Sequence, residues 1–404
     1  MQFQKNLHIF AANKNIKTMK KELFIYNFII FLIAAIGGCG GQTKNTSVEN
    51  GVIEFDLAEA LENEAVTIDD MIDSIKIIPL ETSNESLLSF IYNVHVSPQN
   101  IFIQDLLTGI NIFDHQGKFI TKIAKGTGPK EIATPVAMSY DETNNLLYIY
   151  DAGGNKLMKF NSDGEFLSYH QLDGLSAIRD INITDNIMIV AQEMPNNSFA
   201  ISTGDTTGTI IDTFIVGNCQ YPFTFKKYIM PYGGGFNIKT MLDNNIYYFK
   251  DNIIKTKYKL KYPMPTLDYS KYERMRDMEQ DIPSDKYIFE GEYLESKDYL
   301  YTHLVEGHNK GKLLFTNKKT GKSVCITAKQ RSLTMYMSIE NVCTNSDNWF
   351  VGLIRPDKFA SNKIPEEYRW DGSILNGKIS DEDMEKLKAI KPDDNPVIVI
   401  YKLK

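Results

Sequence analysis

Short runs of β-branched and aromatic residues, bounded by Asn, Asp and Gly, dominate the pattern of apolar and polar positions along the chain. Runs of this length and composition predict β-strands joined by tight turns. Two segments are clear copies of each other, namely IYNVHVSPQNIFIQDLLTGINIFDHQGKFITKI (91–123) and VAMSYDETNNLLYIYDAGGNKLMKFNSDGEFLSYH (136–170). Each copy predicts a strand, a turn, a strand that ends in Asp, a loop, a strand, a turn of the form x-x-G and a last strand.

The two copies define a repeating unit. Their equivalent residues are 46 or 47 positions apart: Asp105 and Asp151, Phe113 and Phe160, Gly117 and Gly164. A period of roughly 40–50 residues with four strands per unit is typical of a β-propeller blade. Weaker copies predict four further blades, over residues 177–216, 222–262 and 287–326 and from Met335 to the C-terminus.

The two ends of the folded chain are expected to close the ring. The last predicted blade contains the strand VIVIYKLK (397–404) but lacks a fourth strand, which Ser74–Leu80 (SIKIIPL) can supply. Pairing of these strands removes the sheet edges that an open array would expose. The sequence therefore predicts an all-β fold, a six-bladed β-propeller with four-stranded blades that is closed by pairing of its N- and C-terminal strands.

Two short helical insertions are expected between strands. Asp268–Gln280 is charged, and Ser380–Ile390 opens with Ser380 and carries Asp383 three residues later, which resembles a capping box. The apolar residues of the second helix are Met384, Leu387 and Ile390. We expect both helices to lie on the rim of the propeller as decoration of long loops; the alternative is that they contact a partner.

The N-terminal region has the pattern of an export signal. A basic start, Met19-Lys20-Lys21, precedes the apolar run Leu23–Ile36, whose 14 residues are too few for a comfortable membrane span but suit the core of a signal peptide. The run ends in Ile36-Gly37-Gly38-Cys39, which resembles a bacterial lipobox, where the Cys is diacylated and becomes the new N-terminus. The alternative is an ordinary signal peptide with an incidental Cys.

These features divide the chain into three parts. They are a signal peptide over residues 1–38 with its true start at Met19, the lipidated Cys39 with a flexible tether over residues 39–52, and a single propeller domain over residues 53–404. Two or more acyl chains give firm membrane anchoring. Gly40 after the Cys favours the outer membrane of a Gram-negative cell, and the sequence leaves open whether the protein faces the periplasm or the cell surface.

Composition and charge limit the possible functions. With 43% hydrophobic residues among 404, the chain can bury a large core, which excludes wholesale disorder. Without residues 1–38 it holds 39 basic and 50 acidic residues, a net charge of −11. Nucleic acid is therefore not expected as a partner, because its binding depends on neutralising phosphates. An oxidising envelope also permits a disulfide, for which Cys325 and Cys343 are candidates, although their spacing does not decide it.

Three motifs carry a resemblance to a known family. They are Ile78-Pro79-Leu80-Glu81-Thr82, Gly126-Thr127-Gly128-Pro129-Lys130-Glu131 after the first blade, and Asn395-Pro396-Val397 before the last strand. With six predicted blades and a lipobox, the chain resembles the six-bladed β-propeller lipoproteins of gut Gram-negative anaerobes, which are related to NHL-repeat propellers. The resemblance covers roughly residues 50–404. It implies a fold and a location rather than a reaction. Lys130 departs from the family pattern G-x-G-P-G-E.

Polar residues on one face of the predicted ring are candidates for binding a ligand. That face collects the loops between second and third strands and the connections between blades, and its candidates are Asp105, Lys125, Lys130, Glu131, Asp151 and Arg355. His95 and Arg179 are expected on the inner strands of the first and third blades. Such a rim of mixed charge can hold a polar ligand on a rigid scaffold.

A structural role is the alternative for each candidate. Asp105 and Asp151 occupy repeat positions, where we expect their carboxylates to cap turns by accepting backbone N–H groups. The segment Gly126–Glu131 is expected to be a tight connector rather than an anion site, because no helix follows it. His95 and Arg179 face the channel, where a charged side chain needs either a partner or a ligand.

Neither a catalytic constellation nor a cofactor motif is visible in the sequence. His303-Leu-Val-Glu306-Gly-His308 resembles a metal cluster, but an odd separation places residues 303 and 308 on opposite faces of a strand. The G-x-S-x-G nucleophile elbow is absent. We therefore expect no cofactor and no metal.

The sequence favours a non-catalytic, lipid-anchored propeller that binds a ligand, or an envelope protein, peptide or glycan, at the membrane surface. The alternative is a propeller enzyme, of lactonase or lyase type, with a metal in its central channel. That enzyme would need His or carboxylate side chains from several inner strands to converge. His95 is the one residue that visibly meets this demand.

Overall fold

The computed structural model describes residues 46–49, 51–65, 68–175, 177–194, 198–218, 227–240, 242–266, 271, 288–306, 310–327, 337–342, 348–356 and 377–404. Residues 44–404 form one compact unit. The signal peptide and Cys39 lie outside the described residues. Within the described ranges, no helix is long and apolar enough to cross a membrane.

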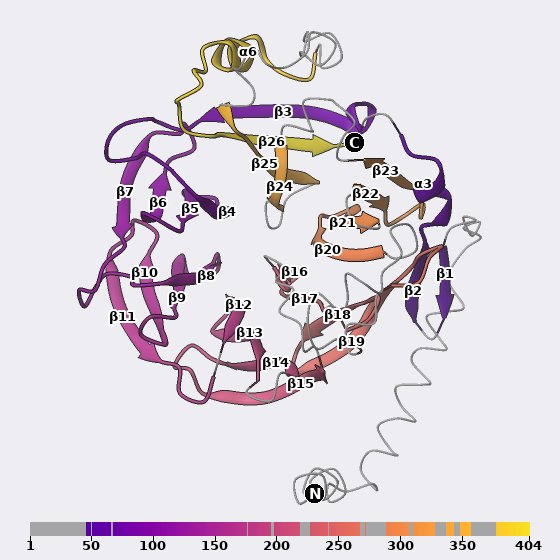
Figure 1. Ribbon diagram of the computed structural model, residues 1–404, viewed down its shortest axis with the longest axis horizontal. Helices are drawn as coiled ribbons and strands as arrows, with labels where there is room; N and C mark the ends of the chain where they lie inside the picture. The colour runs from indigo at the N-terminus through magenta and orange to yellow at the C-terminus, as the bar shows by residue number, and fades with distance from the viewer. Residues whose placement is uncertain are drawn as a thin grey trace, which may run out of the picture. The chain divides into compact units, whose positions relative to one another are not determined.

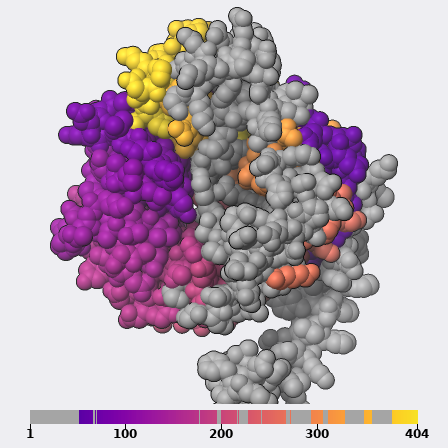
Figure 2. Space-filling view, in the orientation of Figure 1, coloured from indigo at the N-terminus to yellow at the C-terminus, as the bar shows by residue number. Residues whose placement is uncertain are grey.

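Antiparallel four-stranded sheets follow one another around a ring in the first half of the unit (Figure 1). Blade 1 comprises β4 (Ile91–Val96), β5 (Ile101–Asp105), β6 (Gly109–Phe113) and β7 (Phe119–Ala124). Blade 2 comprises β8 (Pro135–Asp141), β9 (Leu146–Asp151), β10 (Lys156–Asn161) and β11 (Phe166–Gln171). Blade 3 comprises β12 (Ile178–Thr184), β13 (Ile187–Glu193), β14 (Ser198–Asp205) and β15 (Ile210–Asn218). These three blades form a continuous surface that runs from purple to pink in Figure 2.

Three further sheets complete the ring. Blade 4 comprises β16 (Ile229–Tyr232), β17 (Gly235–Lys239), β18 (Asn245–Lys250) and β19 (Ile253–Lys261). Blade 5 comprises β20 (Ile288–Glu295), β21 (Tyr299–Glu306), β22 (Lys310–Asn317) and β23 (Ser323–Thr327). Blade 6 comprises β24 (Met337–Val342), β25 (Trp349–Ile354), β26 (Val397–Leu403) and β3 (Ile72–Pro79). The predicted six-bladed propeller with four-stranded blades is confirmed.

The ring closes where the sequence predicted it. The N-terminal strand β3 pairs antiparallel with the C-terminal strand β26, with Ile78 opposite Ile398 and Ile75 opposite Tyr401. β3 is therefore the outermost strand of a blade whose other strands come from the far end of the chain (Figure 1). Separating the two ends of the propeller would expose the edge of β26 to pairing with other chains.

Blade 4 carries two additional strands that the sequence did not predict. β2 (Val52–Asp56) pairs in parallel with the outer strand β19, and β1 (Thr46–Glu49) pairs antiparallel with β2. β1 thus lies inside the segment 39–52 that we expected to be a flexible tether. The physical reason is that β19 offers a free edge and that Phe55 of β2 becomes fully buried in the core.

The repeated glycines mark close contacts between blades. Gly117 and Gly164, in the turns after the third strands of blades 1 and 2, have φ angles of +82° and +81°. A Cβ atom on Gly117 would lie 2.0 Å from the backbone oxygen of Pro79, and one on Gly164 would lie 2.9 Å from the Cδ1 of Ile112. Each turn therefore packs on the preceding blade at a point where no side chain fits.

Apolar clusters fill the spaces between neighbouring blades and position everything that faces the channel. Phe102 and Ile112 of blade 1, for example, pack with Met138 and Ile149 of blade 2. The same arrangement joins blades 2 and 3, blades 3 and 4, and blades 6 and 1, and one large cluster spans blades 4 to 6. Cys325 is buried in that last cluster, whereas Cys343 and the proposed disulfide lie outside the described residues.

Helices are few and lie at the edge of the ring. α6 (Asp381–Lys388) lies where the sequence predicted a helix, and the hydroxyl of Ser380 accepts the backbone N–H of Asp383 at 3.1 Å as its N-cap. The Asp383 carboxylate in turn accepts the N–H of Ile77 on β3 at 3.1 Å, so the helix is fixed to blade 6. The short helices α3 (Ala58–Glu62) and η1 (Asp69–Met71) were not predicted. The helix expected over 268–280 lies almost entirely outside the described residues.

Candidate binding site in the central channel

The innermost strands of blades 1 to 4, β4, β8, β12 and β16, lie next to the centre of the ring (Figure 1). Residues of these strands enclose a small cavity. The cavity has a volume of about 30 Å³, which is room for one water-sized group. The polar residues that line it include Asn93 and His95 from blade 1, Asp180 and Asn182 from blade 3, and Lys227 ahead of blade 4. Of the candidates predicted from the sequence, His95 alone lines this cavity.

Two buried atoms of the cavity lack a hydrogen-bond partner. They are Oδ1 of Asn93 and Nε2 of His95. The two residues are separated by two positions on β4, so their side chains lie on the same face of the strand. A buried polar atom without a partner costs about 1–3 kcal/mol relative to a satisfied one, so these two atoms favour a hydrogen-bonding group in the cavity.

His95 is held in a neutral form. Its ring lies against the rings of Phe102 and Tyr140, with centroid distances of 6.4 and 5.5 Å. Burial, with a smaller contribution from the charge of Lys227, lowers the pKa of His95 to about 3. The carboxylate of Glu142 is 3.9 Å from Nε2, but a neutral imidazole at this distance forms neither a salt bridge nor a hydrogen bond. At neutral pH the ring offers one uncharged nitrogen to the cavity.

Asp180 connects the inner strands of two blades. Its buried carboxylate accepts the backbone N–H groups of Tyr228 at 2.8 Å and Ile229 at 2.9 Å, which lead into blade 4. Beside it, the Asn182 amide donates to the carbonyl of Ile229 at 3.0 Å. Burial raises the pKa of Asp180 to about 6, although both backbone hydrogen bonds and the charge of Lys227 act in the opposite direction. The cavity therefore contains a carboxyl group that titrates close to neutrality.

Asp105 has a structural role in the loops above blade 1. Its fully buried carboxylate accepts four backbone N–H groups, from Ser89 at 2.6 Å, Phe90 and Leu107 at 2.8 Å, and Thr108 at 2.9 Å. Burial alone would raise the pKa of Asp105, but these hydrogen bonds outweigh it and lower the pKa. The carboxylate joins two loops, which agrees with the predicted role of Asp105 in capping turns.

Asp151 takes the equivalent position in blade 2. One oxygen of its carboxylate accepts the N–H groups of Thr134 at 2.7 Å and Gly153 at 3.2 Å. The other oxygen, Oδ2, has no hydrogen-bond partner and lies 3.7 Å from Nζ of Lys156. Both repeat aspartates thus hold the loops of their own blade and do not line the channel cavity.

The connector after blade 1 closes on itself. The Glu131 carboxylate accepts the N–H of Gly128 at 2.8 Å, and the N–H of Gly126 donates to the carbonyl of Ile132 at 3.0 Å. Lys125 donates to the carbonyl of Leu106 at 2.8 Å. Lys130 is exposed and does not adopt a positive φ angle. The geometry is that of a tight connector, which agrees with the structural role predicted for residues 126–131.

The two candidate arginines lie apart from the cavity. Arg179 donates to both carboxylate oxygens of Glu193 on the neighbouring strand, at 2.9 and 2.8 Å, and this pairing raises its pKa. Arg179 is also the extra residue of a β-bulge between Ile178 and Asp180. Arg355 is exposed just after β25. The structure does not bring the candidates together into one site, and their ligand roles stay predictions.

Four polar residues of the cavity were not among the predicted candidates, namely Asn93, Asp180, Asn182 and Lys227. Asn93 lies two residues before His95 on a predicted inner strand, so the alternation of strand faces was a signal that could have found it. Asp180 and Asn182 share an inner strand in the same way. Lys227 could not have been found in this way, because it precedes its strand.

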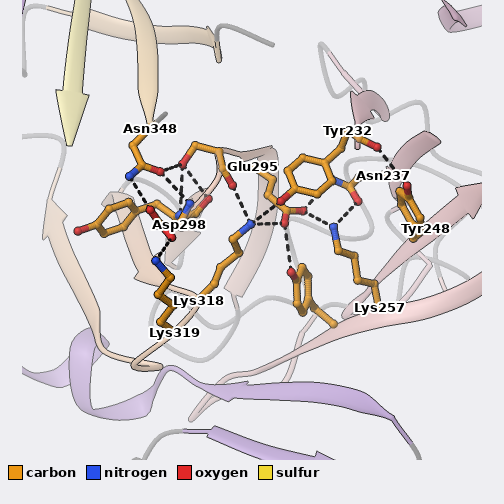
Figure 3. A network of polar contacts seen from close by, with 12 residues as sticks. Tyr232, Asn237, Tyr248, Lys257, Glu295, Asp298, Lys318, Lys319 and Asn348 are labelled. Atoms are coloured by element: carbon orange, nitrogen blue, oxygen red, sulfur yellow. Dashed lines mark hydrogen bonds and ion pairs between the residues drawn. The ribbon is translucent and has the colours of Figure 1, made fainter. Parts of the chain in front are cut away.

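A second polar cluster lies at the junction of blades 4 and 5 and is centred on Glu295 (Figure 3). The Glu295 side chain is fully buried, and its carboxylate contacts the ammonium groups of Lys257 at 2.8 Å and Lys318 at 2.7 Å. It also accepts hydrogen bonds from the Asn237 amide and the Tyr293 hydroxyl at 2.7 Å, and from the Tyr258 hydroxyl at 3.1 Å. The two lysines overcome the effect of burial and lower the pKa of Glu295.

Lys257 reaches this carboxylate because of a β-bulge. It is the extra residue of β19 where Tyr258 pairs with Ile246 and Thr256 pairs with Tyr247. Its ammonium group lies 3.9 Å from the ring centroid of Tyr232 and 5.0 Å from that of Tyr258. Burial lowers the pKa of Lys257. The ammonium is enclosed by aromatic faces and a carboxylate, which are its favoured partners away from water.

Lys318 and the residues beyond it extend the cluster towards blade 6. The ammonium of Lys318 donates to Glu295, to the Tyr232 hydroxyl at 2.8 Å and to the carbonyl of Ser296 at 2.8 Å, which uses all three of its N–H bonds. Asn348 of blade 6 accepts the N–H of Asp298 at 2.7 Å and donates to the Asp298 carboxylate at 3.0 Å. No buried polar atom of these residues lacks a partner among the described residues.

A metal centre is not formed by the residues that the structure describes. Among them, no three His, Cys, Asp or Glu side chains are close enough together to hold an ion. His303 lies on β21, where burial lowers its pKa. His308, the second member of the motif considered in the sequence, lies outside the described ranges.

Comparisons with known proteins extend the description of the fold. Residues 52–402 match the profile of a family described as "Domain of unknown function (DUF4934)". No curated protein matches the chain. A crystal structure from Bacteroides fragilis NCTC 9343, of a protein named as exported, superposes with a TM-score of 0.65 at 16% identity, over 87% of this chain and 99% of the other. A DUF4221 family member from Bacteroides vulgatus ATCC 8482 gives a TM-score of 0.48 at 12% identity, over 82% and 97% of the two chains.

Proposed function

The chain belongs to the DUF4934 family, and from that premise we propose that it is a lipid-anchored, non-catalytic propeller of the cell envelope that binds a polar ligand or partner group in its central channel. The observation that carries the binding role is the pair of buried, unpartnered atoms, Asn93 Oδ1 and His95 Nε2, on the channel face of β4. Polar atoms of this kind are uncommon in native folds and call for a role or a hidden partner. A bound ligand is such a partner.

The chemistry of the cavity restricts the ligand group. Asn93 offers an oxygen that can only accept, and neutral His95 offers a nitrogen that accepts or donates according to its tautomer. A hydroxyl or amide group satisfies both atoms, whereas a carboxylate or phosphate cannot donate to Asn93. The volume of about 30 Å³ admits one such group, so the ligand enters the cavity with a single small polar end.

The channel is tested with probes that carry one polar group each. The full chain is titrated with small alcohols, primary amides, amines and carboxylates while its thermal midpoint is followed. We expect alcohols or amides to raise the midpoint, and we expect His95→Phe and Asn93→Leu to abolish the rise. Lys130→Ala, on the exposed connector, is the matched control and should respond as the wild type does. If no probe raises the wild-type midpoint, or if His95→Phe responds equally, the channel is not the binding site.

The membrane anchor rests on the lipobox at Cys39 and on the likeness of the fold to a protein named as exported. Labelled fatty acid supplied to cells that express the chain should be incorporated into the wild type and not into Cys39→Ser. The variant should also leave the membrane fraction. An unlabelled wild type that is nevertheless exported would instead support an ordinary signal peptide.

Metal analysis separates this proposal from the propeller enzyme. The full chain is purified, passed through gel filtration and measured by mass spectrometry for metal content. We expect no stoichiometric metal and an unchanged fold in chelator. A metal at one equivalent per chain would favour the enzyme, with His95 as the first residue to examine.

A further inference from the structure

A groove with a volume of about 450 Å³ lies where the connection from blade 2 to blade 3 passes over the outer strands of blade 3. Its volume falls within the roughly 300–1,000 Å³ of small-molecule sites. The residues that line it come from the connection Asp173–Leu175, from β13, β14 and β15, and from the turn Thr207–Ile210. It shares none of its lining residues with the channel cavity.

Comparison with blade 2 shows that the fold does not require this groove. Ser202 pairs with Thr213 in blade 3, and in the same register of blade 2 Met158 pairs with Tyr169. Met158 is fully buried and packs in the core between blades 1 and 2. Two large side chains thus occupy positions where blade 3 has two small hydroxyl residues. The groove exists because these residues are small.

The floor of the groove is a chain of neutral polar groups across three strands. The Gln192 amide donates to the Ser202 hydroxyl at 3.2 Å, and the Ser202 and Thr213 hydroxyls lie 2.9 Å apart. Ser202 is fully buried and Gln192 is 4% exposed. These hydrogen bonds satisfy the buried groups, so the floor of the groove is polar and leaves no buried atom of Gln192 or Ser202 without a partner among the described residues.

The walls of the groove disfavour an anionic ligand. Asp173, exposed at the rim, is the one charged residue that lines the groove. The other walls have the hydroxyls of Thr207 and Thr209 and the aliphatic side chains of Leu175 and Ile210. An anionic ligand would meet no cation here and a carboxylate at the entrance. Hydroxyl groups that both donate and accept, next to small aliphatic surfaces, match a molecule with many hydroxyls and an apolar C–H face.

We propose that the groove between blades 2 and 3 binds a neutral saccharide. Its hydroxyl groups exchange hydrogen bonds with the exposed hydroxyls of Thr213 and Thr209, beneath which Ser202 is buried, and the C–H face of a sugar ring packs on Leu175 and Ile210. The groove is open to the surface, so the saccharide can be the end or a branch of a larger glycan. This site is separate from the channel and requires neither the channel ligand nor the lipid anchor.

The test measures saccharide binding to the full chain by calorimetry. The probes are neutral hexose disaccharides and, at the same size, disaccharides that contain a uronic acid. We expect at least one neutral disaccharide to bind, and we expect the acidic ones to bind at least about tenfold more weakly. Absence of binding by every neutral disaccharide, or preference for the acidic ones, overturns the proposal.

Two variants locate the binding site. Ser202→Met with Thr213→Tyr places the blade 2 residues in blade 3 and should abolish binding by filling the groove. Thr213→Val removes one hydroxyl at nearly constant volume and should weaken binding about fivefold, which keeps the test valid if the double variant does not fold. Lys388→Ala, on the exposed face of α6, is the matched control and should bind the saccharide as the wild type does, and His95→Phe is measured beside it. Unchanged affinity in a folded double variant overturns the proposal, and loss of affinity in His95→Phe would place the saccharide in the channel instead.

Discussion

The channel cavity and the junction of blades 4 and 5 both contain buried polar side chains, but the two regions differ in how many hydrogen-bond partners those side chains have. At the junction, Glu295 receives two ammonium groups and three neutral donors, and Lys318 uses all three of its N–H bonds. In the channel, Asn93 Oδ1 and His95 Nε2 have no hydrogen-bond partner among the residues that the structure describes. A buried charge that is paired and hydrogen-bonded already makes its interactions within the fold. Polar atoms without a partner remain available to a ligand.

This difference indicates which of the two regions is the better candidate for a binding site in this propeller. The junction is rich in charge and aromatic rings, which at first sight is typical of a site, yet none of its buried polar atoms lacks a hydrogen-bond partner among the described residues. The channel cavity has less charge and more unused capacity. We therefore assign the junction to stability and the channel to binding, and each of the following changes tests one side of that assignment.

Glu295→Ala should have the largest effect. It leaves the ammonium groups of Lys257 and Lys318 buried without a carboxylate, and breaking a buried pair from one side costs about 3–5 kcal/mol. Urea unfolding of the full chain measures the loss. Lys388→Ala is the control, because its partner Glu385 is 72% exposed and such surface pairs contribute about 0–1 kcal/mol. A loss below about 1 kcal/mol for Glu295→Ala would mean that the junction is not a stability element.

Asp180→Asn should change how stability depends on pH. The folded pKa of Asp180, about 6, is above its ordinary value of 3.8, so this group contributes stability below about pH 4 that is lost as the pH rises to about 6. Asn cannot ionise, so the variant should gain about 1–3 kcal/mol relative to the wild type between pH 4 and pH 7. Urea unfolding at the two pH values measures this difference. An equal gap between variant and wild type at both values would show that Asp180 does not titrate there.

Tyr232→Phe should have an intermediate effect at the junction. The variant keeps the ring that faces the Lys257 ammonium at 3.9 Å but removes the hydroxyl that accepts from Lys318 at 2.8 Å. A hydrogen bond to a charged group contributes about 1.5–3 kcal/mol, and we expect a loss of this size in urea unfolding. Tyr232→Leu, which removes both contacts, should lose more. Equal losses would mean that the hydroxyl, and not the ring, carries the contribution of Tyr232.

His95→Phe should have the smallest effect on stability. The substitution removes an imidazole nitrogen without a partner and keeps an aromatic ring beside Phe102 and Tyr140. We expect the free energy of unfolding to change by less than about 1 kcal/mol, in either direction, because no hydrogen bond is lost. Binding at the channel should nevertheless disappear. A loss of stability comparable to that of Glu295→Ala would show that His95 has a structural partner and would remove the contrast between the two regions.

Much of the fold could be predicted from local sequence patterns. The fifth blade was expected over 287–326, and its strands run from Ile288 to Thr327. The repeated glycines and the strand that ends in Asp identified the turns correctly, because a turn depends on the residues within it. The two strands that extend blade 4 were missed, since β1 and β2 are ordered by pairing with β19 and by burial of Phe55.

The candidate sites were harder to predict. His95 was found because its inner strand was recognised, but its polar neighbours in the cavity other than Asn93 come from other blades. Lys257 shows the difficulty most directly. The run IIKTKYKLK alternates, which predicts that Lys255, Lys257 and Lys259 lie together on one exposed face. A single bulge turns Lys257 inward to Glu295, and bulges are set by the pairing partner rather than by the strand's own sequence.

By itself, the sequence determined the number of blades, the closing strand, the capping aspartates and the glycine turns of this protein. Each of these depends on residues close together in the chain or on the repetition of one unit, which is visible in the sequence. Only the tertiary structure decided which polar groups meet. Glu295 lies 38 residues from Lys257 and 23 from Lys318, and Asn93 and His95 share a cavity with Asp180 of a blade two positions away. The ring brings these groups together through the packing of apolar faces between blades. The sequence does not show which polar atoms that packing will leave without a hydrogen-bond partner.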